Sequence, residues 1–371
     1  MIRARSLLGT LLLGLGLAAT PALSAPPGPD FSAMPDQVAQ FGNPDAPRHL
    51  IIRAAADIAF FTPVIEAFLA SRPDSSITWE DWTTNALHSR VQAECTVGIA
   101  SADLVFSSAA DLQVELVNAG CAQPYRSPQT SALPPARNWR DELFGITEEA
   151  AVMVFNRRTF PGGAIPQNRF ELLDLMRASP ELDGRIATYD IGASGVGNLF
   201  AFQDSLQAST FGSLLESFGR ADVVATCCSV GIVEMIREGR FLVGYNILGS
   251  YAYAVARDDP DIEIVLPSDY TLVLHRAAFI PKAALESELA GAFIDFTLSA
   301  DGRQVLEQEG LIVSSWPDLP GSPIKGEVPA GRLRPIELTP ALRLGLDNMK
   351  HAAFTRSWNA RIKTSPRITL P

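Results

Sequence analysis

Arg185-Ile-Ala-Thr-Tyr-Asp-Ile-Gly-Ala-Ser-Gly-Val-Gly, residues 185–197, is the stretch that decides the fold. Its first five residues predict a short strand, and the apolar run from Asn198 to Phe202 predicts a helix after the turn. Backbone N–H groups at a helix start have no partner inside the helix and point to one place, where they favour an anion. The turn supplies four candidate ligand-binding residues, Ser194, Gly195, Val196 and Gly197.

Small or polar residues also follow three other predicted strands, at the edge where open α/β sheets bind ligands. Strand 241–244 leads to Tyr245 and Asn246, strand 103–106 to Ser107 and Ser108, and strand 49–53 to Ala56 and Asp57. All six are candidate ligand-binding residues. Two other uses stay open, because the first pair could be a packed strand end, and Asp57 and the serines could cap helices.

Three enzymatic interpretations of the glycine-rich turn fail on specific residues. A nucleophile elbow needs glycine where Val196 stands, a dinucleotide fingerprint needs glycine where Phe200 stands, and a nucleotide-phosphate loop needs a lysine that is absent. The four histidines are scattered, with none paired at metal-ligand spacing. We therefore expect no enzyme, no metal site and no cofactor. A secreted hydrolase is an alternative, which ester turnover abolished by Ser194→Ala would support.

The beginning of the chain, residues 1–24, predicts a cleavable secretion signal. Arg3 and Arg5 precede an apolar stretch from Leu7 to Ala19, and small residues follow where a signal peptidase needs them. We expect cleavage after Ser24 and a periplasmic location, since the apolar stretch is too short to span a bilayer. The formal net charge of −11 argues against nucleic acid as a partner.

Strands alternate with helices from His49 onward, which indicates an α/β protein with a mostly parallel sheet. A chain of 371 residues exceeds the size of a single core, so we expect two lobes. An extended run over 144–156 predicts the first crossing between them, and 267–270 the return, before a strand over 272–280. The expected parts are lobe 1 from 48–148 plus 268–315, lobe 2 from 149–267, and a linker with a C-terminal helix packed on a lobe from 316–371.

Three phrases of the sequence resemble those of periplasmic solute-binding proteins of ATP-binding-cassette (ABC) importers. They are the 185–197 segment, Gly244-Tyr-Asn-Ile-Leu-Gly-Ser-Tyr and Leu266-Pro-Ser-Asp-Tyr-Thr-Leu. The branch resembled includes ferric-ion, hexose-phosphate and phosphoglycerate-type binding proteins. The resemblance implies the type II periplasmic binding protein fold, with a ligand cleft between two lobes and with Ser107 and Ser108 facing that cleft.

The resemblance also bears on metal binding and on the cysteines. Ferric relatives use adjacent tyrosines where this chain has Ser250-Tyr251, so a ferric-ion binding protein is a less favoured alternative. Four cysteines in an exported chain allow three pairings. Pairing across the lobes would lock a hinge that must move, so we expect Cys95–Cys121, and the adjacent Cys227 and Cys228 either as a ring or as thiols.

The sequence thus predicts the solute-binding component of an ABC importer. We expect a monomer that captures a small anionic solute, a phosphorylated sugar or an organic acid, between its lobes and delivers it to an ABC permease in the inner membrane. The phosphoglycerate-type relatives imply one alternative partner, a histidine kinase that reads a periplasmic ligand sensor.

Overall fold

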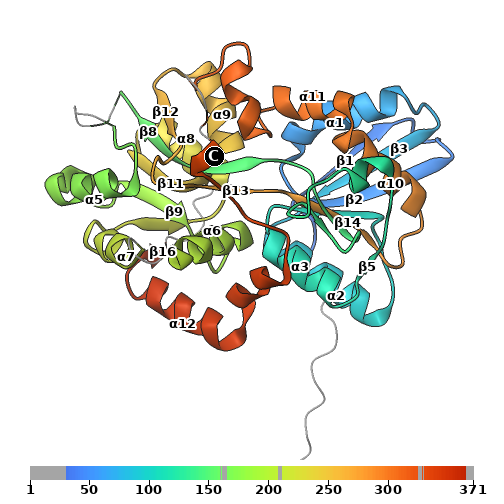
Figure 1. The fold of residues 1–371 in the computed structure, drawn as a ribbon, viewed down its shortest axis with the longest axis horizontal. Coiled ribbons are helices and arrows are strands. Elements are labelled where there is room, and N and C mark those ends of the chain that lie inside the picture. The colour runs from blue at the N-terminus through green and yellow to red at the C-terminus, as the bar shows by residue number, and fades with distance from the viewer. Residues whose placement is uncertain are drawn as a thin grey trace, which may run out of the picture.

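Two β-sheets, each with its own helices, form the two lobes of the protein (Figure 1). The structure is a computed structural model that describes residues 31–158, 160, 165–207, 211–324, 328 and 330–364. The expected secretion signal, residues 1–24, lies outside the described residues. Within the described part of the chain, no helix has both the length and the apolar character needed to cross a membrane.

The first lobe is built on a sheet with the strand order β1-β3-β2-β4-β14-β7-β6, with β5 paired to β14. Its strands are β1 (Gln37–Gly42), β2 (Arg48–Ala55), β3 (Ser75–Asp81), β4 (Leu104–Ser107), β5 (Ala122–Gln123), β6 (Asn138–Trp139), β7 (Leu143–Gly145) and β14 (Ala277–Pro281). Its helices are α1 (Ile58–Ala70), α2 (Thr84–Val97), α3 (Ala110–Asn118), α4 (Pro128–Ser131), α10 (Ser287–Leu298) and α11 (Ala300–Gln308). Strands β2, β3 and β4 are parallel, and most of their residues are buried, as expected of parallel strands covered on both faces.

The second lobe is built on a sheet with the order β15-β13-β8-β11-β9-β10-β16, with β12 paired to β8. Its strands are β8 (Glu149–Asn156), β9 (Ile186–Tyr189), β10 (Val224–Thr226), β11 (Val243–Leu248), β12 (Ile262–Val265), β13 (Thr271–Leu274), β15 (Leu333–Pro335) and β16 (Lys363–Thr364). Its helices are α5 (Arg169–Ala178), η1 (Pro180–Leu182), α6 (Gly195–Leu206), α7 (Phe211–Arg220), α8 (Ser229–Arg237), α9 (Gly249–Asp258) and α12 (Asn348–Asn359). The neighbouring parallel strands β9 and β10 lead into α6 and α8, so both helices begin at one edge of the sheet.

The return crossing between the lobes differs from the sequence prediction. The strand predicted over 272–280 is two strands, β13 in the second sheet and β14 in the first, so the chain crosses at His275 and Arg276 and not at 267–270. Contacts with the first crossing cause this break. His275 Nδ1 lies 2.5 Å from the Thr147 carbonyl oxygen, and the Arg276 amide donates to Thr147 Oγ1 at 2.9 Å.

The C-terminal residues are more than the predicted linker and helix. Strands β15 and β16 extend the second sheet at opposite ends, and α12 packs on the second lobe, where the Phe354 ring lies 5.8 Å from that of Phe202. The short 3₁₀ helices η2 (Val313–Asp318), η3 (Ala330–Arg332) and η4 (Pro340–Leu346) lie between these elements. The apolar residues that recur at helical spacing over 342–353 are divided between η4 and α12, and Met349 is 83% exposed.

Candidate functional site

A cleft of about 300 Å³ lies between the two lobes. It is lined from the first lobe by Asp36, Gln37, Ala55, Ala56, Asp57, Asp81, Trp82, Thr83, Thr84 and Ser108, from the second lobe by Tyr189, Ala193, Ser194, Val196, Cys227, Cys228, Ser229, Val230, Leu248 and Tyr251, and from the return crossing by Arg276. Five of the ten residues predicted to bind ligand line this cleft: Ala56, Asp57, Ser108, Ser194 and Val196.

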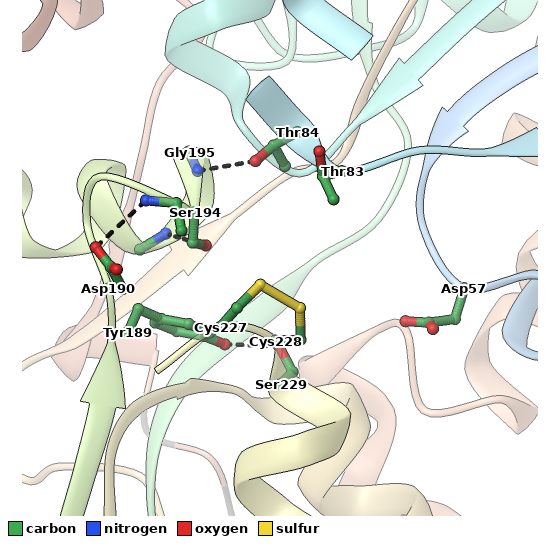
Figure 2. The surroundings of a disulfide bond; sticks show 12 residues. Asp57, Thr83, Thr84, Tyr189, Asp190, Ser194, Gly195, Cys227, Cys228 and Ser229 are labelled. Carbon is green, nitrogen blue, oxygen red and sulfur yellow. Dashed lines mark hydrogen bonds between the residues drawn. A yellow bond between two sulfur atoms is a disulfide. The ribbon is translucent and has the colours of Figure 1, made fainter. Parts of the chain in front are cut away.

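Ser107 and Gly195 lie next to the cleft without lining it. The Ser107 hydroxyl accepts a hydrogen bond at 3.1 Å from the amide of Ala109, the N-cap residue of α3, which is a local turn bond and not a cap of the helix. The Gly195 amide donates across the lobes to Thr84 Oγ1 at 2.8 Å (Figure 2). A Cβ on Gly195 would meet Leu112 Cδ1 at 2.9 Å, so glycine is needed here for close approach of the lobes.

The glycine-rich turn largely satisfies its own amides. Ser194 is the N-cap of α6, and its hydroxyl accepts from the Gly197 amide at 3.1 Å. Asp190 Oδ1 accepts from the amides of Gly192 at 2.8 Å and of Ala193 at 3.3 Å, so a carboxylate of the chain itself binds the residues just before the helix. Gly197 faces the interior, where a Cβ would lie 2.3 Å from the Cβ of Tyr189. The turn is therefore a self-capped helix start pressed against the first lobe.

Helix α8 begins at the same edge without such a cap. Its N-cap residue, Cys228, accepts no side-chain hydrogen bond from the first turn. In the described part of the chain, the amides of Ser229, Val230 and Gly231 have no hydrogen-bond acceptor. The Ser229 hydroxyl is held by the hydroxyl of Tyr189 at 2.7 Å. The ligand-binding residues predicted from the sequence do not include this helix start, although the small residues Ser229 and Gly231 after an apolar strand are a signal for it.

Two disulfides are present in the structure. Cys95 and Cys121 are joined in the first lobe, the expected pairing, with 5.4 Å between their Cα atoms. Cys227 and Cys228 form the other disulfide, which resolves the two states left open by the sequence in favour of the ring. Figure 2 shows its sulfur atoms in the space between the Ser194 turn, Thr83 and Asp57. This disulfide is therefore part of the cleft wall.

Tyr245 and Asn246 do not line the cleft, which corrects the prediction from their place after a strand. They lie inside β11 at an irregularity between Gly244 and Ile247, where Asn246 has a φ of 56°. Both side chains donate to Asp204 Oδ2 at 2.6 Å, and the buried Arg169 guanidinium completes the cluster through Tyr245. This network holds the second lobe together beneath the cleft.

Hydrogen bonds also connect the two lobes directly. Asn85 Nδ2 donates to the Gly192 carbonyl at 3.0 Å, and the Tyr251 hydroxyl donates to Asp57. Burial raises the pKa of the Tyr251 phenol well above its ordinary value. The neighbouring Ser250 hydroxyl donates to Glu149 at 2.5 Å. The pair Ser250 and Tyr251 thus consists of a buried serine and a phenol that stays protonated.

Negative charge gathers on the first-lobe wall of the cleft. Asp36, Asp57 and Asp81 all line it. Burial, followed by the charges of Asp57 and Asp36, raises the pKa of Asp81 to about 7. Among the described residues that line the cleft, Arg276 is the only basic side chain, and Glu149 binds its Nε at 2.7 Å. This wall therefore favours a cationic group.

Comparisons with known proteins agree with this architecture. The family model described as bacterial extracellular solute-binding protein matches residues 100–323. The substrate-binding protein of an ABC transporter from Agrobacterium tumefaciens is 36% identical, with a TM-score of 0.80 over 90% of this chain and 100% of that one. A search of curated proteins found no match.

Two more distant structures share the fold. The periplasmic binding protein AfuA from Actinobacillus pleuropneumoniae, with fructose-6-phosphate bound, is 17% identical, with a TM-score of 0.67 over 85% of this chain and 99% of that one. Iron-bound HitA from Pseudomonas aeruginosa is 18% identical, with a TM-score of 0.62 over 84% and 99%. The chain belongs to the bacterial extracellular solute-binding protein family of ABC transporters and has the two-lobed type II periplasmic binding protein fold.

Proposed function

We propose that this solute-binding protein captures a small solute with an anionic group, and that the start of α8 receives that group. The observation that carries the proposal is the first turn of α8, which lies at the cleft. Three amides of this turn have no hydrogen-bond acceptor in the described part of the chain. Such amides and the positive end of the helix dipole favour negative charge. The proposal places the anionic group at the start of α8 and not at the Ser194 turn, where Asp190, Ser194 and Thr84 accept from the amides of Gly192, Gly197 and Gly195.

The charges on the opposite wall favour one class of anionic solute over another. A phosphorylated sugar is dianionic near neutral pH and would face the carboxylates of Asp36, Asp57 and Asp81. A solute with a carboxylate at one end and an ammonium group at the other matches both walls. Of the two ligand classes expected from the sequence, the unphosphorylated carboxylates are therefore favoured, and within them the small zwitterionic acids.

Calorimetry with chemically matched compounds tests this proposal. We expect an ω-amino acid of three to five carbons to bind more tightly than the carboxylic acid or the amine of the same length, and more tightly than hexose phosphates. At a hundredfold excess over its dissociation constant, the bound compound should stabilise the protein by about 2.7 kcal/mol. Tight binding of a hexose phosphate without binding of zwitterions would contradict the proposal that the solute is zwitterionic. Binding of neutral sugars or amines alone would contradict the proposal that the solute carries an anionic group.

Delivery to an ABC permease is the proposed fate of the solute, with a histidine kinase as the alternative partner. Membership of a transporter family supports the permease. The test reconstitutes the inner-membrane permease encoded beside this chain's gene in vesicles and measures its ATP hydrolysis. We expect stimulation by the loaded protein over the unloaded one. Stimulation of a kinase encoded there, with no effect on a permease, would instead assign the protein to sensing.

A further inference from the structure

The Cys227–Cys228 disulfide stands at the junction between the cleft wall and the start of α8. Both cysteines line the cleft, and Cys228 is both exposed and the N-cap residue of α8. In Figure 2 the disulfide lies beside Ser229, the first residue of the helix. Its position therefore couples the covalent state of two sulfur atoms to the helix start that the proposed function uses.

The backbone at Cys228 has a conformation that cysteine rarely adopts. Its φ is 77° and its ψ is 125°, which places it in the region that favours glycine and is costly for a residue with a Cβ. A bond between adjacent side chains closes a small ring through the peptide that joins them, and this ring limits the backbone angles that Cys228 can take. The amides of Ser229, Val230 and Gly231 follow directly, so their directions depend on the Cys228 angles.

We propose that the Cys227–Cys228 disulfide is a positioning element that directs the first-turn amides of α8 into the cleft, so that its reduction weakens solute binding. The proposal rests on the proposed function, because it assigns a redox control to the same site. A dithiol reductant supplies the two electrons and two protons. The S–S bond of the protein breaks, two cysteine thiols form, and the reductant becomes a cyclic disulfide.

The other disulfide provides an internal control. Cys121 is buried, with 4% of its surface exposed, and Cys95–Cys121 borders a separate cavity of about 340 Å³ that is lined only by residues of the first lobe. Thiolate attack depends on access to the sulfur atoms. Mild reduction should therefore open Cys227–Cys228 first, and peptide mapping after alkylation identifies which disulfide has opened.

The direct test measures affinity for the tightest-binding ω-amino acid of the calorimetric panel before and after mild reduction with dithiothreitol. We expect reduction to weaken binding about tenfold, because closure must restore the costly angles at Cys228. The Cys95→Ser/Cys121→Ser variant should respond in the same way. Unchanged affinity in protein that mapping shows to be reduced at Cys227 and Cys228 would overturn the proposal.

A pair of variants separates positioning from direct contact between sulfur and solute. Cys227→Ser/Cys228→Gly removes both sulfur atoms, and glycine adopts the positive φ at position 228 without a steric cost. Cys227→Ser/Cys228→Ser also removes both sulfur atoms, but serine has a Cβ and keeps the conformational cost of the positive φ. Neither should respond to dithiothreitol. We expect the glycine variant to stay within about threefold of the oxidised protein and the serine variant to bind about tenfold more weakly. Equal affinities of the two variants would overturn the positioning role.

Hydrogen exchange at the amides of residues 229–231 provides a test that needs no solute. Reduction should change the exchange rates of these amides at least severalfold and leave those of the α6 first turn unchanged. If no compound of the panel binds but these rates change as expected, the proposed function fails while the control of the helix start stands. If a zwitterion binds and the rates do not change, the positioning role fails while the proposed function stands.

Discussion

Helices α6 and α8 begin side by side at one sheet edge, and their first turns serve different purposes. The α6 turn is rich in glycine, and Asp190, Ser194 and Thr84 of the first lobe accept from three of its amides. The α8 turn follows two cysteines, has no side-chain cap, and begins in the cleft wall. The comparison teaches that a glycine-rich helix start can mark close packing, here of Gly195 against Leu112 of the first lobe.

The largest expected effect comes from a carboxylate at the start of α8. Val230 lines the cleft at the second position of this helix, where an acidic residue suits the helix dipole. Val230→Asp should leave the melting temperature unchanged or raised, and should weaken binding of an ω-amino acid more than about 100-fold, since like charges placed together cost several kcal/mol. Calorimetry measures the loss. The neutral Val230→Asn is the matched control, and an equal loss in both variants would contradict the charge argument.

A methyl group on Gly195 tests whether the α6 turn serves lobe closure. Its Cβ would crowd Leu112 and Thr84 only when the lobes are together. Gly195→Ala should therefore weaken binding about tenfold, as expected from a packing clash of roughly 1–3 kcal/mol. Small-angle scattering should report a larger radius of gyration at saturating solute than for the natural protein. If the lobes close fully and affinity still falls, the α6 turn contacts the solute, and the contrast with α8 is wrong.

The first-lobe wall of the cleft, which faces the helix starts, should make solute affinity depend on pH. The pKa of Asp81 is raised from its ordinary 3.8 to about 7, so the folded protein holds a proton that the unfolded chain releases. Its contribution makes the solute-free protein less stable as pH rises from about 4 to 7. An ammonium group favours the carboxylate form, so affinity for a zwitterion should increase severalfold between pH 5.5 and 8.

Asp81→Asn is the variant for this pH test. It should flatten the dependence of affinity on pH and remove part of the stability loss over the same interval, as followed by calorimetry and thermal unfolding. An affinity that falls with rising pH in the natural protein would mean that the first-lobe wall does not receive a cation.

The smallest expected effect concerns a single hydrogen bond across the lobes. Asn85 Nδ2 donates to the Gly192 carbonyl of the α6 turn at 3.0 Å. Because Asn85 is partly exposed, Asn85→Ala should weaken solute binding only about threefold, in the range of one net hydrogen bond. Combined with Gly195→Ala, it should add little, since both changes act on the same closed contact. Full additivity would indicate that the two residues act on separate steps.

Much of the fold follows from local sequence patterns, and the exceptions follow from contacts distant in the chain. Apolar runs and helix starts predict the alternating elements of both lobes. The break between β13 and β14 was missed because Leu272–Ile280 looks like one strand. Thr147 and Glu149 impose the break by binding His275 and Arg276 from the other crossing.

The candidate site was also predictable only in part, because local sequence patterns do not show contacts that are distant in the chain. The rule that ligands gather at the carboxyl ends of strands locates Asp57, Ser108 and Ser194 in the cleft wall. It fails for Tyr245 and Asn246, because an irregularity in β11 and the carboxylate of Asp204 turn both side chains inward. Neither cause is visible from residues 241–246 alone.

The two edge strands β15 and β16 also have a consequence for biosynthesis. They pair with β13 and β10, strands that leave the ribosome well before them, so the second sheet stays incomplete until the last part of the chain has been made. The first sheet likewise waits for β14. Pairings so distant in sequence form slowly. A nascent chain with this topology therefore remains unfinished over most of its synthesis.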